Sequence, residues 1–136
     1  MHLEPLYRFT AALTPRPIGP TPDGMRIDVE FEGELDPGGR LMGHLKAVNF
    51  VTARDDGVQL VDVRGTITTP DGDIVSFKAT GITVPAPDGS TVVRDAATYQ
   101  TASAKLAWLN RTVGFIGGTA NLRTGELTLA AYTLED

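Results

Sequence analysis

Residues 25–35, which read MRIDVEFEGEL, give the clearest indication of the fold. Ile27, Val29 and Phe31 alternate there with charged residues, and this period of two is typical of a β-strand with one apolar and one solvent-facing side. The stretch directly follows Pro-Asp-Gly at residues 22–24, a tripeptide that favours a tight turn. The same combination of a turn and an alternating strand recurs along the chain.

Turn signals divide the rest of the sequence into similar segments. Asp-Gly pairs lie at residues 23–24, 56–57, 71–72 and 88–89, and Pro-Gly-Gly lies at 37–39. Segments rich in Val, Ile, Thr and Phe between these turns predict eight strands: 3–13, 25–35, 40–54, 58–69, 73–84, 91–101, 112–120 and 126–134. Apart from residues 102–110, no segment of the chain has a helical pattern.

The spacing of the turns indicates how the strands are arranged. In the first half of the chain the turn signals lie about 15–18 residues apart, whereas the strands of a typical sandwich are spaced by about 8–12 residues. Long strands joined by short hairpins favour an all-β fold, a closed up-and-down antiparallel eight-stranded β-barrel, which is the size that holds one small ligand. An open sandwich is the alternative.

Length and composition limit the chain to one domain, residues 1–136. There are no cysteines, which excludes disulfides, and the formal net charge is −5, which argues against nucleic-acid and membrane partners. The N-terminal segment fits neither a secretory signal nor a transit peptide, so a cytoplasmic location is expected. The Asn-x-Thr sequon at residues 110–112 is therefore interpreted as chance.

One segment, residues 102–110, reads ASAKLAWLN and contains strong helix formers. Leu106 and Leu109 are three residues apart, and Asn110 is a suitable end for a helix. We expect one or two helical turns that cap a mouth of the barrel. The alternative is a distorted end of the preceding strand.

The known motifs of cofactor and metal chemistry are absent. The chain has two histidines, His2 and His44, and neither has a companion at metal-ligand spacing. No nucleotide-binding loop, calcium loop or nucleophile elbow is found either. We therefore expect no cofactor and no metal, and an enzyme of this composition would rely on carboxylates, arginine, tyrosine and amides for proton transfer.

The parity of the strands predicts which side chains face the interior, and Asn49 is the polar exception among them. An amide on an apolar face needs a partner or is desolvated at a cost of about 1–3 kcal/mol. Asn49 either turns outward at a bulge, bonds to backbone, or contacts a ligand. The predicted inner face comprises Tyr7, Phe9, Ala11, Ile27, Val29, Phe31, Leu41, Leu45, Ala47, Asn49, Val51, Val61, Val63, Val75, Phe77, Leu127 and Leu129.

Asp62 and Arg64 share one face of the segment 58–69 and are able to form an ion pair. By parity both face solvent, where such a pair contributes little. A bulge near Gly65 would instead turn Arg64 inward, where its guanidinium suits a carboxylate or an enolate. We expect Arg64 to reach the cavity or its mouth, held there by a carboxylate.

Tyr7, Tyr99 and Trp108 are aromatic residues with a polar end, and each is a candidate ligand contact. Each also suits the core, because buried Tyr and Trp are common where the polar end finds a partner. His44 falls on the outer face by parity and is predicted to be a surface histidine rather than a general base.

Several short motifs resemble one known family. They are LEPLYR at 3–8, GPTPDGMR at 19–26, Gly33, LMG at 41–43, DGV at 56–58, VDVR at 61–64, DG at 71–72 and WLN at 108–110. Together they resemble a bacterial and fungal family of uncharacterised barrel proteins, catalogued as a domain of unknown function. The resemblance covers nearly the whole chain and implies a closed antiparallel barrel similar to that of allene oxide cyclase.

The resemblance also bears on single residues. Asp62 and Arg64 look like the family's Asp-x-Arg, and residues 108–110 look like its Trp-Leu-Asn. The chain departs from the family at Asn49, where an aspartate after two glycines is the family's pattern and where Ala47 and Val48 replace the glycines. The resemblance implies the fold and a small-molecule cavity, with no catalytic role attached.

Three functions fit these expectations. The first is an isomerase, lyase or cyclase acting on a mainly apolar, oxygen-bearing metabolite, with Arg64 stabilising an oxyanion, Asp62 or a tyrosine moving a proton, and Asn49 orienting the substrate. The second is a binding module for an apolar small molecule, and the third is a structural protein whose barrel is filled by its own side chains. A homodimer is also expected, because the outer face carries apolar residues: Met42, Val48 and Phe50.

Overall fold

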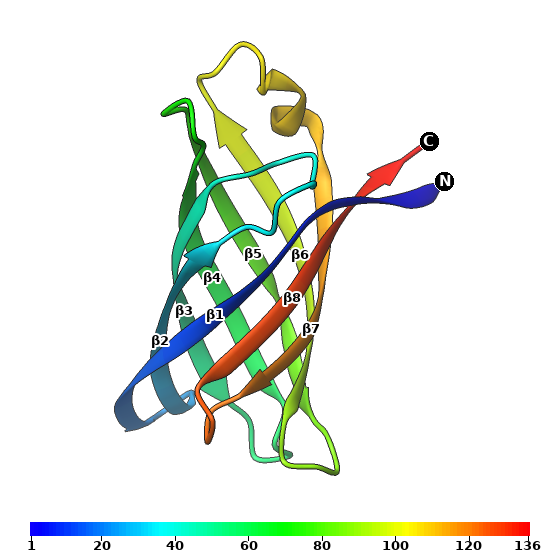
Figure 1. Ribbon diagram of the computed structural model, residues 1–136. Helices are drawn as coiled ribbons and strands as arrows, with labels where there is room; N and C mark the ends of the chain where they lie inside the picture. Colours follow the sequence, from blue (N-terminus) through cyan, green and yellow to red (C-terminus); the bar gives the residue numbers. More distant parts are fainter.

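The structure, a computed structural model that describes residues 1–136, is a closed barrel of eight antiparallel strands in chain order (Figure 1). Each strand pairs with its neighbours in sequence, and β1 closes the barrel by pairing with β8. The prediction of an up-and-down eight-stranded barrel is confirmed, and the sandwich alternative is wrong. The strands are β1 (His2–Thr21), β2 (Gly24–Glu34), β3 (His44–Ala53), β4 (Gln59–Thr68), β5 (Ile74–Pro85), β6 (Thr91–Thr101), β7 (Val113–Asn121) and β8 (Glu126–Glu135).

The first strand is longer than predicted, because it continues through Pro15, Pro17 and Pro20 to Thr21. Proline removes a backbone donor, and within a sheet it is found mainly on an open edge, at the start of a strand or at a bulge. Beyond Leu13, β1 has β2 on one side and no strand on the other, since its pairing with β8 ends at Ala12. The N–H of Leu13 points to the β8 side, where it donates to the Gly125 carbonyl. Pro15 and Pro17 have the same parity as Leu13, so the N–H groups that they lack lie on the edge that pairs with nothing.

The Asp-Gly turns have the geometry that the sequence predicts. Gly57, Gly72 and Gly89 have φ values of +87°, +86° and +86°, and each closes its turn with a backbone bond from its N–H to a carbonyl three residues earlier. A left-handed φ is inexpensive only for glycine. These turns therefore fix the hairpins β3–β4, β4–β5 and β5–β6.

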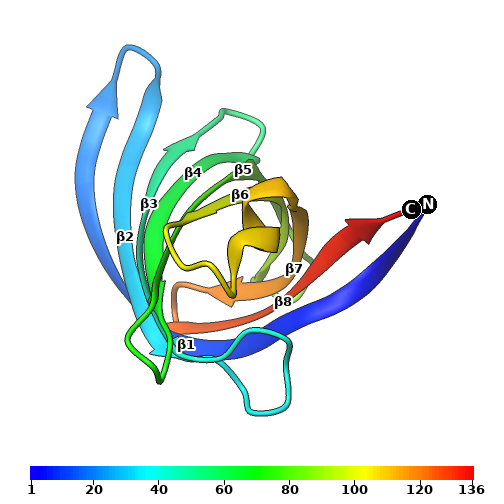
Figure 2. The ribbon, with the colours of Figure 1, turned by 90° about the horizontal axis from the view of Figure 1, so that it is seen from above.

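A short 3₁₀ helix, η1 (Ala107–Arg111), covers one end of the barrel. Seen from above, η1 lies over the centre of the ring of strands (Figure 2), and its own residue Leu109 is fully buried. Asn110 accepts a bond from the Thr101 N–H at 2.8 Å and donates to the Thr101 carbonyl at 3.1 Å, which ties the segment to the end of β6. The predicted helical cap is confirmed in a shorter form, and the alternative of a distorted strand end is wrong.

The structure contains no helix with the length and the apolar character that a membrane span requires.

The predicted inner face is confirmed. All of its members are buried except Ala11, Ile27 and Asn49, which are half-buried on the same face. The main cluster includes Leu6, Tyr7 and Leu109 at the end beneath η1, and it extends along the interior to Leu127 and Leu129 on β8. A smaller cluster of Val29, Val51 and Val61 lies apart from it, so the two ends of the barrel are packed differently. Of the residues behind the expected homodimer, Met42 and Phe50 are about two-fifths exposed, and the homodimer stays a prediction.

Inward-facing glycines make room for large side chains on the neighbouring strand. A Cβ added to Gly65 would lie 2.9 Å from the ring of Phe77, and one added to Gly114 would lie 2.8 Å from the hydroxyl of Tyr99. Gly81 stands in the same relation to Asp95, whose carboxylate oxygen Oδ1 would be 2.7 Å away. Close approach of this kind allows eight strands to enclose a nearly filled interior.

Candidate functional site

A cavity of about 60 Å³ lies inside the barrel at the end opposite η1. It is bounded by the first residues of β4 and β6, the last residues of β5, and the β7–β8 turn, where Leu122 is exposed to solvent. Its walls are mostly apolar. The lining residues are Leu13, Ile27, Val29, Phe31, Asn49, Val51, Gln59, Val63, Thr83, Thr91, Val93, Asp95, Ala120, Leu122, Leu127 and Leu129.

Asp95 is the one ionisable residue in this lining. It is 9% exposed, and its Oδ1 atom has no hydrogen-bond partner. Burial without a partner disfavours the charged carboxylate, and it raises the pKa of Asp95 from 3.8 to about 7. Near neutral pH the site therefore holds a carboxyl group in both its protonated and its ionised form.

Asp95 also borders a second, smaller void of about 20 Å³ on the side of the capped end. The two spaces share four lining residues: Phe31, Val63, Asp95 and Leu129. The carboxyl group therefore lies at the floor of the open cavity, between it and the packed core. Nine of the ten residues that line the smaller void are apolar, so it lacks the two or more polar partners that a buried water needs.

Two carboxamides line the same cavity, and one of them is Asn49. Its Oδ1 accepts the backbone N–H of Asp62 at 3.2 Å, at the point where the β3–β4 register skips the residues after Asn49. The bond to backbone, one of the alternatives for this residue, is therefore present, and the outward bulge is wrong. Asn49 also lines the cavity, and its contact with a ligand stays a prediction. The second carboxamide is Gln59, whose Oε1 accepts the hydroxyl of the buried Thr83 at 2.7 Å.

Arg64 does not reach the cavity, and that prediction is wrong. The register of β4 with β3 and with β5 runs through Gly65 without a shift, so no bulge turns Arg64 inward. The side chains of Arg64 and Asp62 are 61% and 42% exposed on the outer wall, with 3.6 Å between Arg64 Nε and Asp62 Oδ1. Gly65 instead gives space to Phe77.

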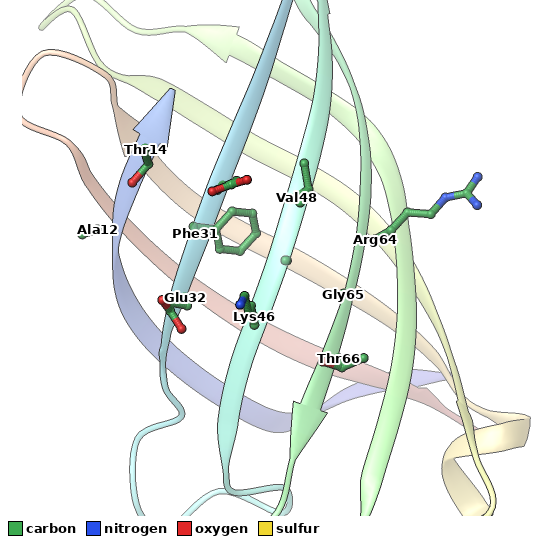
Figure 3. A pocket seen from close by; sticks show the side chains of 11 residues that line it. Ala12, Thr14, Phe31, Glu32, Lys46, Val48, Arg64, Gly65 and Thr66 are labelled. Atoms are coloured by element: carbon green, nitrogen blue, oxygen red, sulfur yellow. The ribbon is translucent and has the colours of Figure 1, made fainter. Parts of the chain in front are cut away.

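The surroundings of Arg64 form an open groove of about 490 Å³ on the outside of β1 to β4. In the close view the Arg64 side chain extends away from the other labelled residues (Figure 3). Glu30, Glu32 and Lys46 also line this groove, so it is charged and solvent-facing, unlike the interior cavity.

Replacing Arg64 is expected to have little effect. In Arg64→Ala the free energy of unfolding should change by less than about 0.5 kcal/mol, because the ion pair with Asp62 is exposed and screened. Urea unfolding of both proteins measures the change. A loss several times larger would show that this pair supports the barrel wall.

Tyr7 and Tyr99 are buried in the core, and their hydroxyl groups hydrogen-bond to each other at 3.1 Å. Burial raises the pKa of Tyr99 to about 12 and raises that of Tyr7 well above its ordinary value. Tyr7 borders the smaller void, and neither tyrosine lines the open cavity. Both tyrosines therefore fit the core role, which was the alternative to a ligand contact. Near neutral pH neither hydroxyl ionises.

Trp108 belongs to the capped end. It lies on η1 with the guanidinium of Arg40 4.5 Å from its ring centroid, a cation–π contact. It is absent from the lining of the open cavity, and its role as a ligand contact stays a prediction. His44 lies on the outer face, as predicted, with Nε2 2.8 Å from Glu32, and this hydrogen bond raises the pKa of His44.

Sequence reasoning did not select Asp95, although a signal for it was present. In the predicted strand 91–101, parity places Asp95 on the same face as Val93, Ala97 and Tyr99, and all four are buried. A carboxylate inside an alternating apolar series is the indication. Gln59 and Thr83 lie near strand ends, where parity is harder to assign.

Solved structures with this fold come from several organisms. A β-barrel-like protein from Acinetobacter baumannii is 22% identical, with a TM-score of 0.86 over 98% of this chain and 96% of that one. A protein of unknown function from Clostridium acetobutylicum is 19% identical, with a TM-score of 0.85 over 99% and 100%. An enzyme from Penicillium herquei is 23% identical, with a TM-score of 0.71 over 98% and 94%.

The likeness to these structures establishes the fold. No curated protein matches the sequence. The model of one family, described as proteins of unknown function, matches residues 1–134, which is nearly the whole chain. The chain therefore belongs to the DUF3237 family.

Proposed function

We propose that this protein is a cofactor-independent isomerase, lyase or cyclase that moves a proton on a mainly apolar, oxygen-bearing small molecule. The observation that carries the proposal is the Asp95 carboxyl group, unpartnered at the floor of an apolar cavity. Asp95 takes the role for which Asp62 and Arg64 were candidates, because those two lie on the outer wall.

The pKa of about 7 suits this role. A general acid or base works best when its pKa lies near the working pH, because both protonation states are then populated. Burial supplies the shift here, and a substrate bound in the cavity would exclude the water that competes for the proton. Strongly perturbed carboxyl groups in clefts are common at catalytic sites.

The size of the cavity limits what enters it. About 60 Å³ holds a small reacting group, while the rest of a substrate lies toward the mouth, where Leu13, Ile27 and Leu122 present apolar surface. The substrate is therefore expected to be apolar over most of its area and to carry its polar group at one end.

A binding module for an apolar small molecule is the rival function. Burying the carboxyl group of Asp95 costs folding free energy. In a protein that only binds an apolar ligand, no interaction with the ligand would offset this cost. The presence of Asp95 in the cavity therefore favours a catalytic function over simple ligand binding. The similar fold of an enzyme from Penicillium herquei supports the same choice.

The test is exchange of the α-hydrogens of cyclopentanone in D₂O, followed by proton NMR. This ketone exposes a weakly acidic C–H beside a carbonyl and is small enough to place that end in the cavity. We expect the wild-type protein to accelerate exchange with an inflection near pH 7 and Asp95→Asn to lose about 10²–10⁴-fold of that acceleration.

The matched control is Asp62→Asn, which removes a carboxylate from the outer wall. It should exchange cyclopentanone at the wild-type rate. If Asp95→Asn is as fast as the wild-type protein, or Asp62→Asn is as slow as Asp95→Asn, the proposed role of Asp95 is wrong.

A further inference from the structure

Asn49 and Gln59 share a feature that sets the chemistry of the cavity. Each carboxamide has already used its carbonyl oxygen, Asn49 with the backbone N–H of Asp62 and Gln59 with the hydroxyl of Thr83. A backbone N–H only donates, so the orientation of the Asn49 amide is fixed by chemistry. Each residue is left with its NH₂ group.

Neither NH₂ group has a hydrogen-bond partner in the protein. Asp95 Oδ1 is sealed from solvent without a partner, whereas neither NH₂ group is sealed in this way, so both are open to an incoming molecule. Both residues line the cavity that Asp95 closes at its floor. The cavity thus offers an incoming molecule two amide donors and one carboxyl group.

We infer that the substrate is a neutral carbonyl compound whose oxygen is held by the NH₂ groups of Asn49 and Gln59 while Asp95 takes a proton from the neighbouring carbon. This inference rests on the proton-transfer function proposed above. It adds the class of the substrate and two residues that bind its oxygen.

The step balances without a co-reactant. The Asp95 carboxylate accepts the proton from the α-carbon, the electron pair of that C–H bond forms the C=C bond, and the carbonyl π pair moves to oxygen. The resulting enolate carries its charge on the oxygen that faces the amide donors, which is where such donors stabilise a transition state most. Return of the proton from Asp95 to carbon at the same or a conjugated position gives the exchanged or isomerised product.

The charge of the lining explains why the substrate is neutral. No lysine, arginine or histidine lines the cavity. A carboxylate or phosphate brought in would lose its water and face Asp95 with no cation to offset either charge. A neutral carbonyl has one strong acceptor, and the two amides supply the matching donors.

The experiment combines two readouts on the wild-type protein with cyclopentanone as the probe. Side-chain NH₂ resonances in ¹⁵N–¹H NMR spectra report binding of the carbonyl, and α-hydrogen exchange reports catalysis. We expect cyclopentanone to shift the NH₂ signals of Asn49 and Gln59 and to leave that of Gln100, which lies exposed on β6, unchanged.

The variants Asn49→Asp and Gln59→Glu keep the acceptor oxygens and the side-chain volumes, but each replaces the NH₂ donor with a carboxylate oxygen, which repels a developing enolate. Each should lower kcat for exchange by about 10²-fold with a smaller change in KM, because the donors act on charge that develops in the transition state. Gln100→Glu is the matched control and should exchange at the wild-type rate.

The outcomes separate this inference from the function on which it rests. If exchange depends on Asp95 but neither NH₂ signal moves and both variants keep the wild-type kcat, the amide assignment is overturned and the proton-transfer function stands. If the NH₂ signals move without exchange that depends on Asp95, carbonyl binding stands and catalysis fails. Binding of cyclopentanecarboxylate as tight as that of cyclopentanone would overturn the requirement for a neutral substrate.

Discussion

The free energy of unfolding should fall as the pH rises from about 4 to 7, and Asp95 should be the main cause. The pKa of Asp95 is about 7 in the folded protein against an ordinary value of 3.8, so between these values the folded state holds a proton that the unfolded state has lost. Stability is greatest below the unfolded pKa and is lost as the pH rises through the folded one. This difference in the pKa of Asp95 corresponds to a loss of up to about 4 kcal/mol in the free energy of unfolding.

Asp95→Asn isolates this effect. Urea unfolding of both proteins at pH 4 and pH 8 gives two differences in free energy, and exposed groups such as His44 and Asp56 cancel between the proteins. The variant should be the more stable protein at pH 8, with most of its advantage gone at pH 4. Parallel pH profiles for the two proteins would show that Asp95 is charged and satisfied in the fold.

Gly81→Ala should lower the free energy of unfolding by at least about 3 kcal/mol, because the added methyl group meets backbone as well as a side chain. The new Cβ would lie 2.2 Å from the Arg94 carbonyl oxygen and 2.7 Å from the Cα of Asp95. Neither atom can move without separating β5 from β6. Chemical denaturation and thermal unfolding both measure the loss.

Gly117→Ala is the control for the Gly81 variant. Gly117 is also a strand glycine that pairs with β6, but its added Cβ would be 3.8 Å from the nearest atom, the carbonyl oxygen of Val93. This variant should stay within about 0.5 kcal/mol of the wild-type protein. Equal losses in both variants would mean that strand propensity, and not the close approach to Asp95, governs these positions.

The strand order was predictable because each hairpin is encoded locally. The alternation of Ile27, Val29 and Phe31 and the Asp-Gly turns determine which segments pair, without reference to the rest of the chain. The continuation of β1 through Pro15 and Pro17 was not predictable in this way. It depends on an edge that has no partner strand, which is a property of the assembled barrel.

The site was only partly predictable. Parity placed Asn49 inside, and the same rule applied to residues 91–101 also places Asp95 there. The expectation that Arg64 turns inward needed a bulge at Gly65, but the identity of one glycine does not distinguish a bulge from space for Phe77. Two features of the site depend on contacts between strands that only the folded chain defines. Asp95 Oδ1 has no hydrogen-bond partner, and the carbonyl oxygens of both carboxamides accept hydrogen bonds from other strands.

The closing pair, β1 with β8, has a consequence for how the chain assembles. Every other strand pairing joins two consecutive strands. The β1–β8 pairing, in which His2 lies opposite Glu135, instead joins the two ends of the chain. The entropy of closing so long a loop makes this pairing the most costly contact to form early, so the seven hairpins can build before the ring is sealed. The two ends of the finished chain then lie side by side (Figure 1). A chain joined there and opened at Gly72 in the β4–β5 turn would contain the same eight strand pairs, with the slow closing step moved from β1–β8 to β4–β5.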